Sequence, residues 1–132
     1  MQVHADAQSD LELIHSNDSD SWAEIVVFLE EVKDSHDTLD NFSRHGYVEY
    51  SEYVYEVKEL AKPKRDRYNL WRIKFLESDS KAKDYRIIYA FNPQALQYHV
   101  LGVLKREIAY EFAHPRTCKV LSAYDELDLP RL

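Results

Sequence analysis

The sequence predicts one α+β domain, residues 1–132, in which an N-terminal helical hairpin packs on a small antiparallel β-sheet. A chain of 132 residues without a repeat or a linker fits a single domain. Apolar residues recur at helical spacing in the first third of the chain, and three later segments alternate apolar and polar residues at strand spacing. The links between these later segments are short, which favours antiparallel neighbours.

The N-terminal region predicts a polar extension followed by two helices. Within residues 1–20 only residues 11–14 (LELI) are apolar enough for a short edge strand. Ser21 and Glu24 have capping-box spacing, which predicts a helix over residues 21–34. Asp37 begins a shorter helix that carries Leu39 and Phe42 and ends near Gly46. The apolar face of the longer helix comprises Trp22, Ile25, Val26, Leu29 and Val32.

The middle of the chain has the composition of strands. Residues 47–57 are rich in Tyr and Val, and residues 62–67 form a basic loop. Strands are predicted over residues 68–76, 85–91 and 96–104, with one sheet face packed on helices and the other free. Residues 107–112 and 117–127 are helical or irregular. In the last strand we expect Leu96, Tyr98, Val100 and Leu104 on one side.

Charge is distributed unevenly along the chain, whose formal net charge is −7. Residues 1–60 hold fifteen acidic and three basic side chains, whereas residues 61–106 hold eleven basic and four acidic ones. Local potential steers an anionic ligand more than the total charge does. The basic half therefore either binds an anion or is neutralised within the fold, and residues 1–20 could cover it as an internal shield.

Several classes of protein are excluded by composition. The apolar runs are too short to span a bilayer, and no secretory signal follows Met1, so a cytoplasmic location is expected. The single Cys118 cannot form an internal disulfide. The histidines show no metal-ligand spacing and only two glycines are present, so neither a metal, another cofactor nor a glycine-rich phosphate loop is expected.

Three short motifs in the predicted strands are similar to those of a known family. They are residues 70–75 (LWRIKF), residues 84–89 (DYRIIY) and the basic turn at residues 105–107 (KRE). In order and spacing they resemble the RelE/ParE superfamily, RelE/HigB-like branch, the small ribonuclease toxins of bacterial toxin–antitoxin pairs. The resemblance covers about residues 22–126. The chain departs from the family in its acidic total charge and its longer N-terminus.

The resemblance implies metal-independent cleavage of mRNA, commonly on the ribosome, by attack of a ribose 2′-OH on the adjacent phosphate. Lys74 would transfer the proton with Arg72 beside it, and Arg86 and Arg106 would hold the phosphate. Tyr110, or failing it Phe112, would stack on a base. A cognate antitoxin, mRNA and the ribosome are the partners implied. The residues that would guide the RNA backbone are Lys62, Lys64, Arg65, Arg67 and Lys105.

Other interpretations of the same residues stay open. Strand alternation alone would place Arg72 and Lys74 on a solvated face, and Arg86 could form a structural ion pair with Asp84. His99 and His114 are alternative general bases because the ordinary pKa of histidine lies near neutrality. At the level of function, the alternatives are a ParE-like topoisomerase inhibitor and a catalytically inactive interaction module, which the acidic total charge favours.

Overall fold

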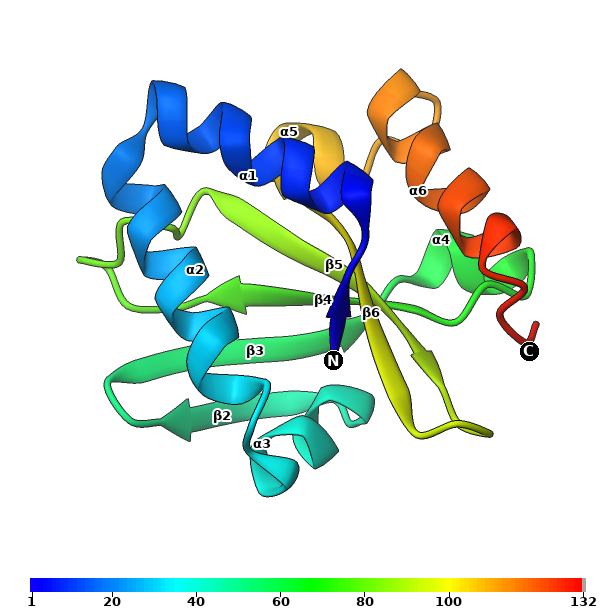
Figure 1. Ribbon diagram of the computed structural model, residues 1–132, viewed down its shortest axis with the longest axis horizontal. Helices are drawn as coiled ribbons and strands as arrows, with labels where there is room; N and C mark the ends of the chain where they lie inside the picture. The colour runs from blue at the N-terminus through cyan, green and yellow to red at the C-terminus, as the bar shows by residue number, and fades with distance from the viewer. Residues whose placement is uncertain (132) are drawn as a thin grey trace.

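A six-stranded sheet forms the centre of the computed structural model, which describes residues 1–131 (Figure 1). The strands lie in the order β1-β6-β5-β4-β3-β2. β1 pairs with β6 in parallel, and all other neighbours are antiparallel. The α+β class and the adjacency of the three predicted strands are therefore confirmed. The strands are β1 (Gln2–Val3), β2 (Gly46–Tyr50), β3 (Tyr53–Glu59), β4 (Leu70–Phe75), β5 (Tyr85–Asn92) and β6 (Gln97–Lys105).

Helices lie on both faces of this sheet. The first group covers one face and consists of α1 (Ala5–Asn17), α2 (Ser19–Val32), α3 (His36–Asp40) and the 3₁₀ turn η1 (Asn41–Ser43). The second group lies on part of the other face and consists of α4 (Ala61–Arg65), α5 (Arg106–Ala109) and α6 (Pro115–Glu126). Within residues 1–131 no helix is long and apolar enough to cross a membrane.

The helices of the first group begin and end differently from the prediction. Residues 11–14 belong to α1 instead of an edge strand, because Ala7, Leu11 and Ile14 recur at helical spacing and pack on the core. The edge strand lies earlier, at Gln2–Val3. The capping box at Ser21 and Glu24 was also wrong: Asp18 caps α2 by accepting a hydrogen bond from the Ser21 backbone N–H.

An aromatic cluster joins the first helical layer to the sheet. Phe28 of α2 makes edge-to-face contacts with Tyr53, Tyr55 and Phe75, with ring centroids 5.0 to 5.1 Å apart. Phe42 of η1 lies 5.2 Å from Tyr89, whose buried hydroxyl donates a hydrogen bond to the Phe42 carbonyl at 2.6 Å. Edge-to-face geometry adds to the stabilisation from apolar burial. The side chains of β3, β4 and β5 on this face are thereby held in place.

The opposite face is not free along its whole length, as had been predicted. A second apolar cluster packs α6 against β6, where Val120 would lie 3.2 Å from a Cβ on Gly102, so only glycine allows this close approach without a shift. At a β-bulge, Ile88 of β5 pairs with Gly102 of β6 and Tyr89 pairs with Val100, so Leu101 has no partner on β5. The extra residue shifts the alternation along β6. As a result Leu104 belongs to the second apolar cluster, whereas Tyr98 and Val100 face the first layer. The single-sided pattern expected for the last strand was therefore wrong, and Leu96 lies in an exposed turn.

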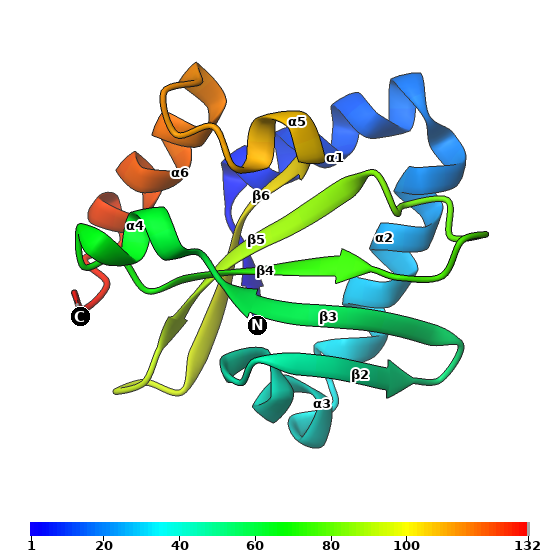
Figure 2. The same cartoon turned by 180° about the vertical axis from the view of Figure 1, so that it is seen from behind.

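Two further segments differ from expectation in detail. Residues 47–57 form the hairpin of β2 and β3, whose turn places Ser51 in the left-handed region at φ 55°. Most of the basic loop at residues 62–67 is the short helix α4. Figure 2 shows that β2, β3 and β4 have no helix over them on the side seen from behind.

The acidic N-terminal region does not shield the basic half of the chain. α1 packs along β6 and α2, on the first layer. Its Asp10 accepts hydrogen bonds from Arg116 of α6, at 2.7 and 2.5 Å, and from the Val103 backbone N–H at 3.0 Å. This carboxylate thus links α1, β6 and α6, and the internal-shield hypothesis was wrong.

We expect Asp10→Ala to lower the free energy of unfolding by about 3 kcal/mol, because it leaves the largely buried Arg116 without its counter-ion. Chemical denaturation at neutral pH measures this. Glu12→Gln, which removes a charge from an exposed position of the same helix, is the control and should change stability little. Equal stabilities for the two variants would contradict the linking role of Asp10.

Candidate functional site

No helix of residues 1–131 covers one sheet face over β2, β3 and β4 (Figure 2). This uncovered face carries a row of charged side chains. On β3 and β4, Lys58 pairs with Arg72 and Glu56 pairs with Lys74, so these side chains lie on one face. Trp71, Ile73 and Phe75 point the other way into the first core. Arg72 pairs with Ile88 of β5, so these two side chains lie on the same face. Arg86 is two residues before Ile88 on β5 and therefore lies on this face as well.

Three of the predicted catalytic cations line one hollow. Lys74, Arg86 and Arg106 surround a cavity of about 460 Å³ at the ends of β4 and β5. Lys83 and the carboxylates of Glu77 and Asp84 line it as well. This hollow, which we call the basic hollow, brings together residues from β4, β5 and α5, and positive charge exceeds negative charge around it.

Arg86 is held rigidly at the base of this hollow. Its side chain is only 4% exposed, and its Nε donates a hydrogen bond to the Tyr110 hydroxyl at 3.0 Å. Its Nη1 donates to the carbonyls of Lys83 and Tyr85, at 2.9 and 3.0 Å. Arg86 makes no ion pair with any described residue, so the alternative pair with Asp84 does not form. Its Nη2 forms no hydrogen bond within residues 1–131, so the guanidinium is positioned in advance and has a donor left for an anion.

Lys74 and Arg106, which line the same hollow, are held by fewer interactions than Arg86. Lys74 is half-buried and forms no hydrogen bond or ion pair with any described residue. Arg106 opens α5, is 57% exposed, and lies 3.7 Å from Asp84 and 3.3 Å from Glu107. Such exposed pairs contribute little and exchange easily with other ligands. Both side chains can therefore turn toward an anion in the basic hollow.

Arg72 lies on the same face but has a partner already. It is 6% exposed, and its Nη2 lies 2.5 Å from a Glu56 carboxylate oxygen while its Nη1 donates to the Glu56 carbonyl. The hydrogen bond from Arg72 holds the pKa of Glu56 below its ordinary value, and the charge of Lys74 acts in the same direction. Glu56 therefore stays ionised beside the two cations and offsets part of their charge.

A second hollow of about 270 Å³ adjoins Arg72. Tyr110 and Phe112, the two candidates for stacking on a base, both line it, together with Lys58 and Lys62. Tyr110 is 45% exposed, and its ring lies 6.0 Å from the Arg86 guanidinium carbon. The hydrogen bond from Arg86 to the Tyr110 hydroxyl connects this aromatic hollow to the basic one.

The remaining predicted site residues lie elsewhere. Lys105 pairs with Tyr85 and faces the first helical layer near Asp18, so it cannot reach the basic hollow from there. Lys64 pairs with Glu59 at 3.0 Å, and Arg65 and Arg67 are exposed at and beyond the end of α4. His114 caps α6 through its Nδ1, and burial lowers the pKa of His99 at the β1 edge of the sheet. Neither histidine lines the basic hollow.

Sequence analysis missed two lysines that line these hollows. Lys58 belongs to β3, where its alternation with buried Tyr55 and Val57 was the available signal. Lys83 sits in the β4–β5 loop and donates a hydrogen bond to the Ser78 carbonyl. Its place in the sequence, just before residues 84–89 (DYRIIY), did not indicate that the β4–β5 loop lines the basic hollow.

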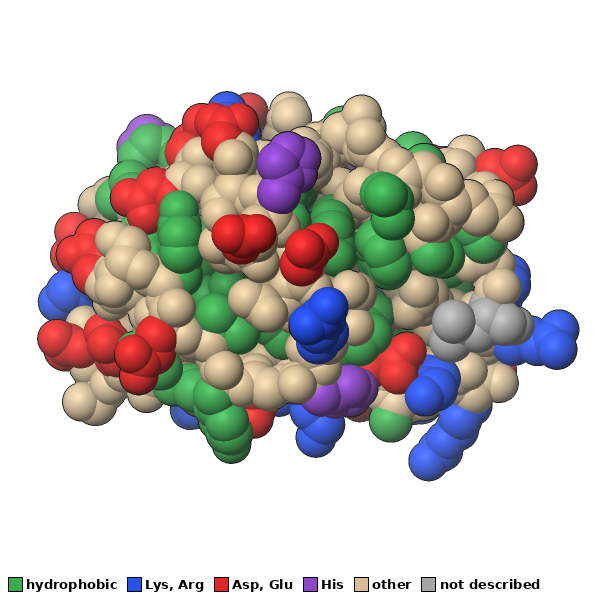
Figure 3. Space-filling view, turned by 90° about the horizontal axis from the view of Figure 1, so that it is seen from below, with side chains coloured by type: hydrophobic (Ala, Val, Ile, Leu, Met, Phe, Trp, Pro, Cys, Tyr) green, Lys and Arg blue, Asp and Glu red, His purple; other side chains and the backbone are tan. Residues whose placement is uncertain are grey.

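The surface reflects the uneven charge of the sequence. Figure 3, a view from below, shows acidic side chains gathered at the left-hand end of the molecule and Lys and Arg side chains toward the lower right. Within residues 1–131 no group of three His, Cys, Asp or Glu side chains is placed to hold a metal ion. The site combines one fixed cation, Arg86, with the less constrained Lys74 and Arg106 beside an uncovered sheet face of an α+β fold.

Comparisons of the chain with protein-family models, with curated proteins and with solved structures give no match.

The pair of Glu56 and Arg72 makes stability depend on pH. Because the pKa of Glu56 is lowered in the folded state, the pair stabilises the protein above the ordinary carboxyl pKa of 4.5 and loses this contribution as the pH falls through the folded-state value. Glu56→Gln should lower the free energy of unfolding at pH 7 by about 1–3 kcal/mol, since Arg72 stays buried, and should flatten its decline between about pH 5 and pH 3.

Denaturation at a series of pH values measures both effects. Glu49→Gln on β2, an exposed carboxylate without an ion pair among the described residues, is the matched control. If Glu56→Gln and Glu49→Gln gave the same pH profile, Glu56 would not be the group responsible.

Proposed function

We propose that this chain is a metal-independent endoribonuclease that cleaves mRNA and acts as the toxin of a bacterial toxin–antitoxin pair of the RelE/ParE type. The observation that carries the proposal is the convergence of Lys74, Arg86 and Arg106 on one hollow beside the uncovered sheet face. In this assignment, α2 and the short helix α3 correspond to the helical hairpin of that family, α1 belongs to the N-terminal extension, and β4 to β6 correspond to the motif-bearing strands.

The proposed reaction needs charge stabilisation and proton transfer, and no redox step. The ribose 2′-OH loses its proton and attacks the adjacent phosphorus, the bond to the 5′-oxygen breaks, and that oxygen takes up a proton. Lys74, which has no internal partner among the described residues, is the group we assign to proton transfer. Arg86 and Arg106 stabilise the added negative charge on the phosphorane. Arg86 is fixed in advance and needs no reorganisation during the reaction, whereas the exposed Arg106 turns toward the phosphate from its carboxylate partners.

Tyr110 has two tasks in this mechanism. Its hydroxyl accepts the Arg86 hydrogen bond and so fixes the guanidinium, and its partly exposed ring is left to stack on a base. The aromatic hollow with Lys58 and Lys62 would carry the neighbouring nucleotide and its phosphate. Arg72 is assigned to holding Glu56 and not to direct contact with the scissile phosphate, because Glu56 occupies its guanidinium.

One observation favours a second candidate function, a catalytically inactive interaction module. Arg72 is neutralised by Glu56, and Arg86 is 96% buried with most of its donors used internally. A protein that only binds a partner would need no more than this. Detection of cleaved RNA ends separates the two candidates directly.

We expect purified protein to cleave mRNA, supplied either free in EDTA or on ribosomes in magnesium-containing buffer, into fragments that carry 5′-hydroxyl ends and 2′,3′-cyclic or 3′-phosphates. Lys74→Ala should reduce the cleavage rate by roughly 10²–10³, the usual cost of removing one such group. Mapping of 5′ ends measures the rate. Lys105→Ala, a cation of the same region that faces the first helical layer, is the control and should leave the rate unchanged.

The Lys74 side chain forms no hydrogen bond or ion pair among the described residues, so its substitution should disturb folding little. Wild-type cleavage by Lys74→Ala would overturn the assigned mechanism. Failure of the wild-type protein to cleave any mRNA, with or without ribosomes, would favour the interaction module.

A cognate antitoxin is the partner that we propose for the uncovered sheet face. A partner with an acidic segment would complement Lys58, Lys74 and Arg106, and its association rate should fall as salt is added. Co-expression with a short neighbouring reading frame, followed by measurement of binding across a salt series, tests this. Lys74→Glu should weaken the complex, whereas a salt-independent affinity unaffected by this variant would exclude the assigned surface.

A further inference from the structure

The outer edge of β2 is a backbone surface without a partner in the described chain. β2 ends the strand order of the sheet and pairs with β3 alone (Figure 1). Two residues separate the paired Tyr50 and Tyr53, and a hairpin of this kind closes on a hydrogen-bonded pair. Hydrogen-bonded pairs alternate along an antiparallel ladder, so Tyr47 and Glu49 direct their backbone N–H and C=O groups away from β3. No hydrogen bond reaches these groups from any of residues 1–131.

This edge lacks the usual features that prevent further strand pairing. Proteins protect sheet edges with prolines, lysines or very short strands. The opposite edge of this sheet is the two-residue β1, whereas β2 has five residues, no proline, no lysine and a single charged residue, Glu49. Tyr47 is 74% exposed, and a Cβ added at Gly46 would meet nothing within 4 Å. The edge of β2 is therefore open to another strand.

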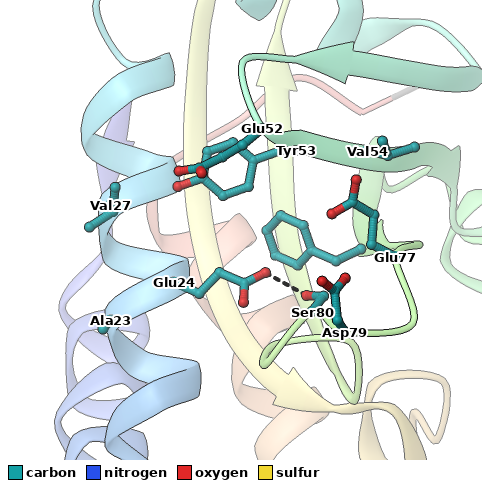
Figure 4. Close-up of a pocket in the computed structure, with 10 residues that line it drawn as sticks. Ala23, Glu24, Val27, Glu52, Tyr53, Val54, Glu77, Asp79 and Ser80 are labelled. Carbon is teal, nitrogen blue, oxygen red and sulfur yellow. Dashed lines mark hydrogen bonds between the residues drawn. The ribbon is translucent and has the colours of Figure 1, made fainter.

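Charge differs between the two ends of this edge. Arg44 and His45 precede β2, and Arg44 has an extended backbone, so it continues the line of the strand. Glu49 lies near the other end, and Glu52 lies in the turn that follows (Figure 4). Arg44, Glu49 and Glu52 are exposed and form no ion pair with any of residues 1–131. The edge thus has a positive and a negative end, and neither is neutralised within the described chain.

Such an edge is complementary to the same edge of a second copy. A two-fold axis makes the two strands antiparallel and places each end of one beside the opposite end of the other. With the axis at Val48, Tyr47 of each copy pairs with Glu49 of the other, so outward backbone groups meet outward backbone groups. Arg44 of each copy then lies opposite Glu52 of the other. An axis at Glu49 would instead oppose two like charges, and an axis at Tyr47 would separate Arg44 from Glu52.

We propose that two copies of this chain associate by antiparallel pairing of their β2 strands about Val48, which joins two six-stranded sheets into one. The axis is perpendicular to the sheet, so the uncovered faces of both copies lie on the same side of the joined sheet. Because a five-residue strand gives a small interface, the dimer should form and dissociate readily. The inference rests on the edge of β2 and does not depend on the proposed function.

Sedimentation equilibrium over a series of protein concentrations tests the association. We expect the weight-average mass to rise from 15.7 kDa towards twice this value. The rise should occur between about 5 µM and about 500 µM, the range of a small reversible interface. In amide hydrogen exchange at the two extremes, the N–H groups of Tyr47 and Glu49 should become protected at high concentration. A chain that stays monomeric throughout would overturn the proposal and leave the edge to an extended segment of another protein.

An exchange of charges distinguishes this pairing from other modes of self-association. Arg44→Glu and Glu52→Arg each place like charges opposite one another at both ends of the pair. Each variant alone should therefore dimerise about tenfold more weakly than the wild type. An equal mixture of the two variants should associate with about the wild-type affinity, because one copy is then acidic at both positions and the other is basic at both. Both residues are exposed and without an ion pair among residues 1–131, so the melting temperatures should stay as in the wild type.

The effect of total charge is controlled by Lys119→Glu and Glu126→Arg. These variants make the same two charge changes at exposed positions of α6 and should leave the dimer affinity unchanged. Mixed Arg44→Glu and Glu52→Arg chains that associate no more tightly than either variant alone would overturn the proposed pairing. Dimerisation that protects other amides and leaves those of Tyr47 and Glu49 unprotected would overturn it as well.

Discussion

Packing of Phe28 and Phe42 on the aromatic residues of β3, β4 and β5 is the interaction on which the rest of this structure depends. It places rings over a large part of one face of the central strands, at centroid distances of 5.0 to 6.4 Å. Truncation of a buried phenylalanine typically costs about 3–5 kcal/mol, a large share of the stability of a domain of this size. Because side chains alternate along a strand, fixing the aromatic face also fixes what lies on the other face.

The other face carries arginines that are largely buried, and their positive charges are accommodated in two different ways. Arg72 is held by a carboxylate, whereas Arg86 is held by neutral acceptors, the Tyr110 hydroxyl and two carbonyls. Neutral acceptors satisfy the N–H groups of a guanidinium without cancelling its charge. Arg86 therefore contributes a full positive charge to the basic hollow, while the charge of Arg72 is largely offset where it stands.

The basic hollow lies next to a second cavity of opposite charge, which is lined by Glu24, Glu52, Glu77 and Asp79. Phe75 and Glu77 line both of them, at the junction of β4 with the loop that follows. Glu77 thus limits how far a polyanion can extend beyond Lys74, and Phe75 closes the path between the cavities. The net charge of −7 consequently gives a poor account of any single surface of this molecule.

Local patterns in the sequence determined a large part of this protein. Alternation in residues 68–76 predicted β4 and the shared face of Arg72 and Lys74, because side-chain direction in a strand follows from position alone. Helical spacing likewise predicted α2. These features need no knowledge of distant contacts.

Only the tertiary structure decided the rest. The bulge at Leu101 turned Leu104 away from Val100, and Asp10 found Arg116 across more than a hundred residues, which no local spacing indicates. The partner of each arginine was also decided at this level: Glu56 and Tyr110 reach Arg72 and Arg86 from β3 and from just beyond α5. A guanidinium forms hydrogen bonds with the acceptors that the fold places within about 3 Å of it. The sequence therefore specified where the charges lie along the chain, and the packing of distant segments determined their partners.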